Sequence, residues 1–533
     1  MRAGLALAGL LLVLGADGAA QTTRAERTGY RETSSHADVL GFLDSLGALG
    51  APISVDTLAI TPGGRVVPYV VASRPLVGRP TEARRSGRPV VYLQANIHGG
   101  EVEGKEAALM LLRDLTLGPL RPLLDSLILL VVPIYNADGN EALAPAAENR
   151  PGQNGPARVG RRANGSGLDL NRDYVKMEAP ETRGAARLVQ AWDPDLFVDL
   201  HTTNGSYHGY TLTFAAGLNP NRTPADDYAR DRFLPEVRRR VARRHGRATF
   251  WYGNFRSQHP DSLAQGWETY DPRPRFGTNW AGMRGRVAVL SEAYSNDDFR
   301  TRVASTYAFV REVLGLAAEE GSAIRDAVES SARQTTDSVT VRSRLGPPAA
   351  EEIIAEITGP AGDGAGGYAR RRRSGVYRTL RMPAYLHFVA ARREALPAAY
   401  LVPNSFAGVV TLLRRQGVTV RRLAAPWTGP VERFRIDSVS AGQLFEGHRP
   451  VRVEGRWSAE SPATAPAGWF LVETAQPAGR FAGYLLEPAS EDGVATWNLV
   501  EPLVPGGVYP ILRSRSPVRA AADTCPDPRE DRC

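Results

Sequence analysis

Cysteine is nearly absent from this 533-residue sequence, since its only two, Cys525 and Cys533, lie among the last nine residues. A cysteine nucleophile or a thiolate metal site in the body of the chain is therefore excluded, although this pair could close a small tail disulfide after export. Lysine is equally scarce, because Lys105 and Lys176 are the only lysines among 65 basic residues. We attribute this bias to genome composition, so the net charge of +8 does not indicate a nucleic-acid partner.

Long apolar runs are also missing, apart from one at the N-terminus. Residues 5–14 are apolar, follow Arg2 and precede the small residues Gly18 and Ala20, which is typical of a secretory signal peptide cut near Ala20. The run falls short of the roughly 20 residues that a membrane-spanning helix needs. We therefore expect residues 1–20 to be removed and the mature protein to be exported, periplasmic or extracellular, without a membrane span.

The length of the chain predicts two domains. Beyond residue 50, short runs rich in valine and isoleucine alternate with amphipathic stretches, which is the pattern of strands crossed by helices. The expected strands lie around Val66, Val91, Leu129, Phe197, Leu212 and Val289, and the expected helices span 103–115, 179–192, 225–245 and 300–318. Because these strands are apolar throughout, we expect an α/β fold with a mixed, mostly parallel twisted sheet covered by helices on both faces.

The sequence becomes polar after residue 319, with clusters of Ser, Thr, Pro and Gly that predict one helical extension and then a linker over 336–375. Residues 376–533 carry the strand-like runs VERFRIDSV, VRVEGRWS, GWFLVET and FAGYLLEP, with one helix over 406–416. We therefore expect a smaller, mainly β C-terminal domain. The sequence has no internal repeat of fixed period, which excludes solenoids and propellers, and it does not indicate an oligomeric state.

Two histidines and a glutamate follow the ends of two expected strands. The segment VVYLQANIHGGEVEGKEAALMLL is a strand, a Gly-Gly turn and a helix, and it places His98 and Glu101 three residues apart just beyond the strand. The strand DLFVDLH brings His201 to the same edge of the sheet. Two imidazoles and a carboxylate form a ligand set that suits a catalytic Zn²⁺, which keeps a fourth position open. We therefore expect one Zn²⁺ per chain at these three residues.

An arginine and a further glutamate complete the expected site. Asn171 and Arg172 in LDLNRDY lie in a loop between the two zinc segments. A guanidinium binds a carboxylate through two parallel hydrogen bonds and an adjacent amide fixes its orientation, as recognition of a free peptide C-terminus requires. Glu292 ends the apolar strand RVAVLSEAY, where a carboxylate costs free energy unless it has a task, and general base is the natural one.

The motifs HGGE, NADG, DLNRD, DLH and LSEAY, in this order, resemble the zinc carboxypeptidase family, also called funnelins, over residues 35–320. The resemblance implies a metallocarboxypeptidase that hydrolyses the C-terminal peptide bond of peptides through a zinc-activated water. It implies a zinc carboxypeptidase-like catalytic domain over 21–335, zinc ligation by His98, Glu101 and His201, and Glu292 as the general base. Asn171 and Arg172 would hold the terminal carboxylate of the substrate.

Two further roles in this family are carried over from the resemblance. The arginine that stabilises the oxyanion is expected at Arg162, although Arg158 and Arg161 are close by and the tryptophan that often precedes the family's arginine is missing. The mobile tyrosine that closes over the bound residue is expected at Tyr270, with Tyr252 as its competitor. Asp173 stands where many relatives have a second asparagine, which would alter the charge of the carboxylate clamp formed by Asn171 and Arg172.

Two other functions remain open at this stage. The same scaffold serves peptidases that act on cell-wall peptides and deacylases that cleave amides of small molecules, and the Asn-Arg pair disfavours the deacylase. A pseudo-peptidase that only binds peptide ends is the alternative outside the enzymes. Retention of all three metal ligands and of Glu292 argues against it.

Overall fold

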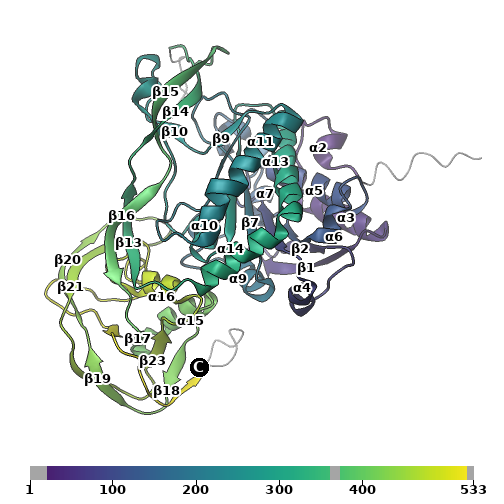
Figure 1. The fold of residues 1–533 in the computed structure, drawn as a ribbon. Coiled ribbons are helices and arrows are strands. Elements are labelled where there is room, and N and C mark those ends of the chain that lie inside the picture. Colours follow the sequence, from purple (N-terminus) through teal and green to yellow (C-terminus); the bar gives the residue numbers. More distant parts are fainter. Residues whose placement is uncertain (1–20, 361–371, 525–533) are drawn as a thin grey trace, which may run out of the picture.

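The computed structural model describes residues 21–360 and 372–524, and an eight-stranded sheet forms the centre of its N-terminal part (Figure 1). The order of the strands across this sheet is β1-β2-β4-β3-β7-β12-β8-β9. They span Ile53–Ile60 (β1), Val66–Ala72 (β2), Val90–Ala95 (β3), Ile128–Val132 (β4), Leu196–Thr202 (β7), Leu212–Ala215 (β8), Thr249–Trp251 (β9) and Val287–Ala293 (β12). The expected signal peptide and both cysteines lie outside the described residues.

The central sheet is mixed, as predicted. Its four parallel pairs are β3 with β4, β3 with β7, β7 with β12 and β8 with β9, and its three other pairs are antiparallel. All six strands expected from apolar runs are present. The two strands that were not expected, β1 and β9, lie at the edges of the sheet. Strand β1, ISVDTLAI, is not a continuous apolar run, and β9 is only three residues long.

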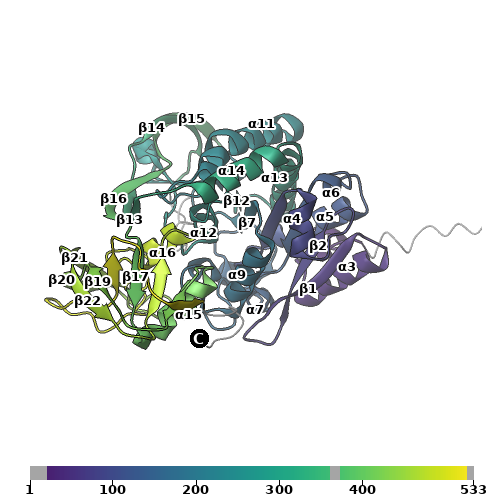
Figure 2. The same cartoon turned by 60° about the horizontal axis from the view of Figure 1, so that its bottom comes forward.

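Helices cover both faces of this sheet, and Figure 2 shows β7 and β12 between α13 and α9. On one face α5 and α13 pack on β3 and β4, and on the other Trp280 of α12 contacts Phe197 of β7. The helices of this region are α2 (Arg24–Arg27), α3 (His36–Ala48), α4 (Pro80–Ser86), α5 (Glu103–Thr116), α6 (Leu123–Ser126), α7 (Ala137–Glu141), α8 (Ala146–Asn149), α9 (Pro180–Trp192), α10 (Pro224–Tyr228), α11 (Leu234–His245), α12 (Gly277–Met283), α13 (Phe299–Glu319) and α14 (Gly321–Arg333).

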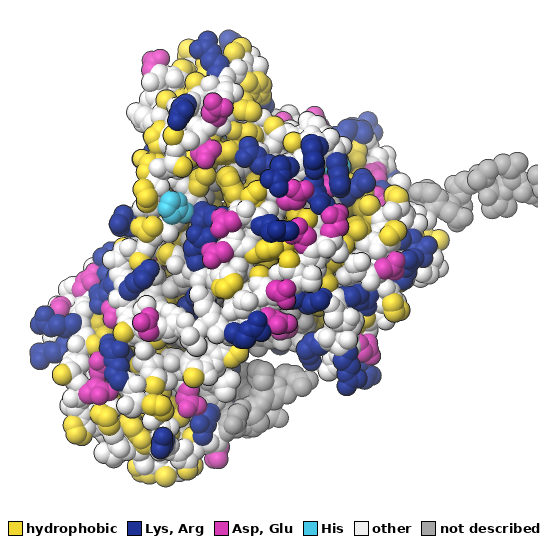
Figure 3. Space-filling view, viewed as in Figure 1, with side chains coloured by type: hydrophobic (Ala, Val, Ile, Leu, Met, Phe, Trp, Pro, Cys, Tyr) yellow, Lys and Arg dark blue, Asp and Glu magenta, His cyan; other side chains and the backbone are white. Residues whose placement is uncertain are grey.

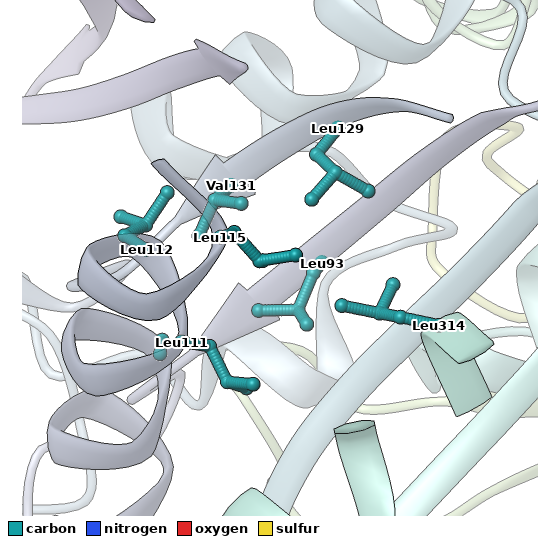
Figure 4. A pocket seen from close by; sticks show the side chains of 8 residues that line it. Leu93, Leu111, Leu112, Leu115, Leu129, Val131 and Leu314 are labelled. Carbon is teal, nitrogen blue, oxygen red and sulfur yellow. The ribbon is translucent and has the colours of Figure 1, made fainter. Parts of the chain in front are cut away.

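The packing of α5 and α13 on the sheet leaves little free space. Figure 4 shows leucine and valine side chains of β3 and β4 facing Leu112 and Leu115 of α5 and Leu314 of α13. The gap between them is about 10 Å³, the volume of one water molecule at most. It is therefore a packing defect of the core and not a ligand site.

We expect Leu112→Ala to destabilise the protein by about 3 kcal/mol, because it removes buried methyl groups and enlarges this gap. Leu112 is fully buried, whereas Leu444, which is 66% exposed, provides a matched Leu→Ala control. Urea unfolding of both variants checks the difference. A loss of stability equal to that of Leu444→Ala would show that the core around Leu112 collapses to fill the space.

The prediction of a linker over 336–375 is wrong in part, because this segment contains two strands. Strand β13 (Ser338–Leu345) pairs with β16 (Phe388–Ala395), and β14 (Ala349–Glu356) pairs with β15 (Tyr377–Tyr385). Strand β15 also pairs, in parallel, with β11 (Trp267–Glu268), which in turn pairs with β10 (Asn254–Phe255). This four-stranded sheet forms the upper part of Figure 1, so residues beyond 336 complete the structure around Trp267.

The C-terminal part contains several small sheets and two helices, α15 (Ala407–Arg415) and α16 (Gly479–Leu486). Most of the run FAGYLLEP, predicted as a strand, lies in the buried helix α16, because a short apolar run such as Phe481–Leu486 fits a buried helix as well as a strand. The strands are β17 (Ala399–Val402), β18 (Arg421–Leu423), β19 (Trp427–Val431), β20 (Phe434–Ala441), β21 (Val451–Trp457), β22 (Ser461–Ala465), β23 (Phe470–Glu473), β24 (Leu512–Ser514) and β25 (Ala522–Thr524).

Buried polar contacts join the C-terminal part to the N-terminal part that holds the eight-stranded sheet. Arg275 forms an ion pair with Asp492 at 2.8 Å, and both side chains are almost completely buried. The Gln416 amide accepts a hydrogen bond from the Trp280 indole and donates to the carbonyl of Tyr174. Because buried polar groups are costly unless paired, these contacts fix how the two parts sit against each other.

The surface carries mixed charge. On the face shown in Figure 3, basic side chains lie among aspartates and glutamates. Ion pairs of Arg240 with Glu236 and Glu319 join α11 and α13. This interleaving is unlike the single-sign surface of a nucleic-acid-binding protein. Among the described residues, none of the helices is both long and apolar enough to cross a bilayer.

Candidate active site

The turn between β3 and α5 carries the first two candidate ligands. Asn96, at a φ of 61°, donates its side-chain amide to the carbonyls of His98, Gly99 and Glu101 and so holds the turn closed. Neither glycine has room for a Cβ, which would lie 2.3 Å from the Gly139 carbonyl carbon at Gly99 and 2.6 Å from the Arg150 side chain at Gly100. The Gly-Gly pair therefore lets His98 and Glu101 turn back toward the strand ends.

The third candidate ligand lies on the neighbouring strand. His201 is next to last in β7, and its Nδ1 is 3.0 Å from Oε2 of Glu101. Nδ1 of His98 is 3.0 Å from the other carboxylate oxygen. One ligand atom from each of the three buried residues lies within 4.8 Å of the others. The cluster thus has the size of a single metal-binding site.

Both histidines are oriented by carboxylates on their outer side, which the sequence analysis did not identify. Nε2 of His98 is 3.0 Å from Oδ1 of Asp169, and Nε2 of His201 is 3.0 Å from Oδ2 of Asp199. These contacts leave each Nδ1 facing Glu101, and such carboxylate partners orient metal-binding histidines. Asp199 had one available signal, an acidic residue within the apolar strand DLFVDLH.

Arg150 is a further residue that the sequence analysis missed. Its guanidinium donates to Oε1 of Glu101 at 3.0 Å and to the carbonyls of Thr202 and Thr203, and the residue is 9% exposed. Burial alone would raise the pKa of Glu101, but His98 and Arg150 hold that pKa well below its usual range. Arg150 therefore keeps Glu101 ionised, and its place in an irregular loop offers no sequence signal.

Glu292 lies beside His201, since the two residues are register partners in the parallel pair of β12 and β7. Its Oε2 is buried and has no hydrogen-bond partner among the described residues. Burial, opposed by His201 and assisted by Glu101, raises the pKa of Glu292 to about 8. A partly buried carboxylate with an unpartnered oxygen beside a polar cluster is typical of a catalytic acid or base.

Asn171 and Arg172 lie on the same edge of the site. The Asn171 amide nitrogen is 3.4 Å from Nε2 of His201, and its oxygen accepts a hydrogen bond from the backbone N–H of Gly277. The Arg172 guanidinium lies 4.0 Å above the ring of Phe276 and donates to the Asn171 carbonyl. The aromatic ring packs against one face of the guanidinium and limits its orientation. The N–H donors, which lie in the plane of the guanidinium, are not occupied by this contact.

Of the three candidate arginines, Arg162 points toward the cluster. Its Nε donates to Asp169 at 2.9 Å, and its NH1 is 3.5 Å from Oε1 of Glu101. Arg158 and Arg161 instead donate to the carbonyls of Leu143 and Asn164. The sequence pattern could not separate these arginines, because their side chains diverge only in the folded loop.

Tyr270 lies near Glu292, packed in the interior of the site. Its hydroxyl is 3.3 Å from Oδ1 of Asn279, and its ring lies 5.4 Å from Phe276 and 5.5 Å from Tyr252. Burial and the neighbouring Glu292 raise the pKa of Tyr270 well above its usual value. Tyr270 is therefore a neutral hydroxyl donor at neutral pH.

The model of the zinc carboxypeptidase family matches residues 52–272, which include His98, Glu101 and His201. Residues 52–272 belong to the zinc carboxypeptidase family. The chain is thus an enzyme of the metallocarboxypeptidase class. Glu292 and the whole C-terminal part lie beyond the region that the family model matches.

Named relatives extend the likeness beyond the matched region. Carboxypeptidase 2 of Trichophyton equinum is 24% identical over 467 residues, covering 84% of this chain and 80% of the relative, and that of Trichophyton rubrum is 24% identical over 469 residues with the same coverage. Among solved structures, a metallo-carboxypeptidase from Burkholderia cenocepacia aligns at a TM-score of 0.40 and 17% identity, covering 54% of this chain and 68% of that one. Carboxypeptidase A from Helicoverpa armigera aligns at 0.40 and 15%, covering 54% and 74%.

Proposed function

We propose that this metallocarboxypeptidase releases the C-terminal residue of peptides in a zinc-dependent hydrolysis. The observation that carries the proposal is the buried His-Glu-His cluster with Asn171 and Arg172 beside it. A metal site next to a carboxylate-binding pair is what cleavage adjacent to a free C-terminus requires. We further propose that residues 1–20 direct export of the protein.

The residues of the cluster fit a zinc ion. Nδ1 of His98 is buried and, although it lies 3.0 Å from Oε1 of Glu101, makes no well-aligned hydrogen bond to the described residues. Nδ1 of His201 and the Glu101 carboxylate lie around the same point. Two histidines and one glutamate are a known set for catalytic zinc, and both histidines have the outer carboxylates that such sites use. When bound there, zinc would act as a Lewis acid and lower the pKa of water at the site.

Glu292 is the proposed general base. Its unpartnered carboxylate beside His201 is positioned to accept the proton of the attacking water and to return it to the leaving amine. Arg162 is proposed to stabilise the negative charge that develops on the carbonyl oxygen, because its Nε is held by Asp169 while its NH1 is directed at the cluster. Tyr270 would close the site over the bound residue.

Arg172 is proposed to bind the terminal carboxylate of the substrate, with Asn171 orienting it. Phe276 under the guanidinium holds its plane, so the exposed edge can make two parallel hydrogen bonds. Only a substrate with a free C-terminus supplies both acceptors. The proposal therefore separates removal of terminal residues from cleavage within a chain.

We expect Arg172→Ala to lower kcat/KM for a peptide with a free C-terminus by about a hundredfold, because the terminal carboxylate of the bound substrate would lose its cationic partner. The same peptide with a C-terminal amide should be cleaved poorly by the wild type and no worse by the variant. Release of the terminal amino acid, quantified for both peptides, provides the measurement. Arg158→Ala is the matched control, since Arg158 is exposed and binds only a backbone carbonyl.

Equal cleavage of the acid and amide peptides by the wild type would contradict the clamp. If the zinc-loaded protein instead releases nothing from peptides but acts on cell-wall fragments, the substrate class changes while the metal site stands. Zinc binding without any hydrolysis would favour a protein that only binds peptide ends.

A further inference from the structure

The hairpin that joins β20 and β21 brings the C-terminal part of the chain to the candidate active site. Its tip is a tight turn in which Phe445 and His448 exchange both backbone hydrogen bonds, at 2.8 and 3.0 Å. Glu446 and Gly447 occupy the centre with φ of 49° and 80°, as a type I′ turn requires. A left-handed φ is unfavourable for glutamate, so the local backbone does not explain why Glu446 stands there.

Glu446 contacts the residue that organises the site. Its Oε2 accepts a hydrogen bond from the backbone N–H of Asp169 at 2.9 Å, across 277 positions of sequence. The Asp169 carboxylate is bonded to Nε2 of His98, to the backbone N–H of Asn171 and to Nε of Arg162. One residue therefore connects a metal ligand, the clamp and the arginine at the cluster, and Glu446 fixes its main chain.

The tip is held firmly enough to act as a fixed support. Nε2 of His448 is 2.7 Å from Oε1 of Glu178, and the rings of His448 and Phe445 lie 5.4 and 6.3 Å from the buried Trp497. The Trp497 indole in turn donates to Asp492, the partner of Arg275. The hairpin tip is thus held by a solvent-exposed contact with Glu178 and by ring contacts with the buried Trp497.

We propose that Glu446 is a positioning residue that the C-terminal domain contributes to the active site. By holding the backbone of Asp169, it fixes the direction in which the Asp169 carboxylate presents itself to His98, Arg162 and Asn171. The C-terminal domain is then a component of the site and not an independent appendage. The effect on peptide hydrolysis rests on the proposed carboxypeptidase function, whereas the effect on the metal ligand does not.

The function of Glu446 depends on its reach and on an acceptor oxygen. Asp169 begins the short 3₁₀ helix Leu170–Arg172, and water can satisfy its N–H if Glu446 is removed. The loss should therefore disturb orientation more than stability. Glutamine keeps an oxygen at the same distance, whereas aspartate keeps the charge but is one methylene shorter and tolerates the left-handed backbone better.

The experiment compares Glu446→Ala, Glu446→Asp and Glu446→Gln in the full chain, with Asp437→Asn as the control because it removes an exposed acid from the same hairpin. Zinc affinity is measured by competition with a chelator, and KM and kcat by release of the terminal residue. We expect the alanine and aspartate variants to bind zinc about tenfold more weakly and to show a KM raised about tenfold. Their melting temperatures and the properties of Glu446→Gln should stay close to wild type.

The proposal is overturned if the alanine and aspartate variants bind zinc and peptide as Asp437→Asn does. It is overturned equally if Glu446→Gln is as impaired as Glu446→Ala, because the hydrogen-bond acceptor would then not be the relevant property. If wild-type protein binds zinc but releases no residue from peptides, the proposed function fails, and the zinc affinities alone decide the role of Glu446. Should Glu446→Ala fail to fold, the comparison of aspartate with glutamine decides.

Discussion

Glu292→Gln should lower kcat by about a thousandfold while leaving zinc bound at one ion per chain. Glutamine matches glutamate in size, so the partly buried side chain keeps its place on β12, but the amide cannot accept a proton from water. The loss should appear in kcat far more than in KM, because Glu292 is not part of the proposed clamp. Terminal-residue release and metal content, measured on the same preparation, provide the test.

Tyr252→Phe is a suitable control for this substitution, since it alters another buried polar group whose pKa is raised by burial and by Glu292. We expect its kcat to stay within about tenfold of wild type, because it supplies no base. A Glu292→Gln variant that keeps wild-type kcat would remove Glu292 from the reaction. In that case another group, and not this carboxylate, would have to accept the proton.

The second large effect concerns the metal. We expect His201→Ala to reduce zinc affinity by more than about a hundredfold and Asp199→Asn by about tenfold to a hundredfold, because outer partners of a ligand contribute less than the ligand itself. Asp199 is completely buried, and its carboxylate contacts Nε2 of His201. The asparagine would therefore weaken the orientation of the His201 ring without removing a metal-binding atom. Isothermal titration of metal-free protein with zinc gives both values.

The order of the two effects is the informative result. Activity should follow zinc occupancy in both variants, and excess zinc should restore Asp199→Asn but not His201→Ala. An unchanged zinc affinity in His201→Ala would place the metal elsewhere. A larger loss in Asp199→Asn than in His201→Ala would mean that Asp199 itself is a ligand.

The sequence predicted those parts of the site that follow the ends of apolar strands. His98, His201 and Glu292 each end or follow such a strand, and the carboxyl ends of the parallel strands β3, β7 and β12 meet at one edge of the sheet. Periodicity and chain order are local properties, so they were sufficient to bring these residues together. The strands around Val66 and Leu129 were found for the same reason.

The remaining parts depend on contacts between distant segments. Arg150 lies in an irregular loop, and Glu446 is an acid in a turn, so neither has a pattern that distinguishes it before the chain is folded. The apolar run in α16 has the length of either a strand or a helix, and burial on all sides removes the periodicity that would separate them. Strands β13 and β14 were read as linker because their partners, β16 and β15, lie further along the chain.

The pairing of β11 with β15 also affects the order in which the chain can mature during synthesis. Trp267 packs with Phe250 and Phe255. The same hydrophobic cluster also needs Met382 and Ala384, which emerge from the ribosome later. Until then the nascent catalytic region exposes a large aromatic surface and an unpaired strand edge, the features that promote aggregation. A gene shortened to end at residue 335 would leave this condition permanent, so expression of the catalytic region alone would need a chaperone or a redesigned edge.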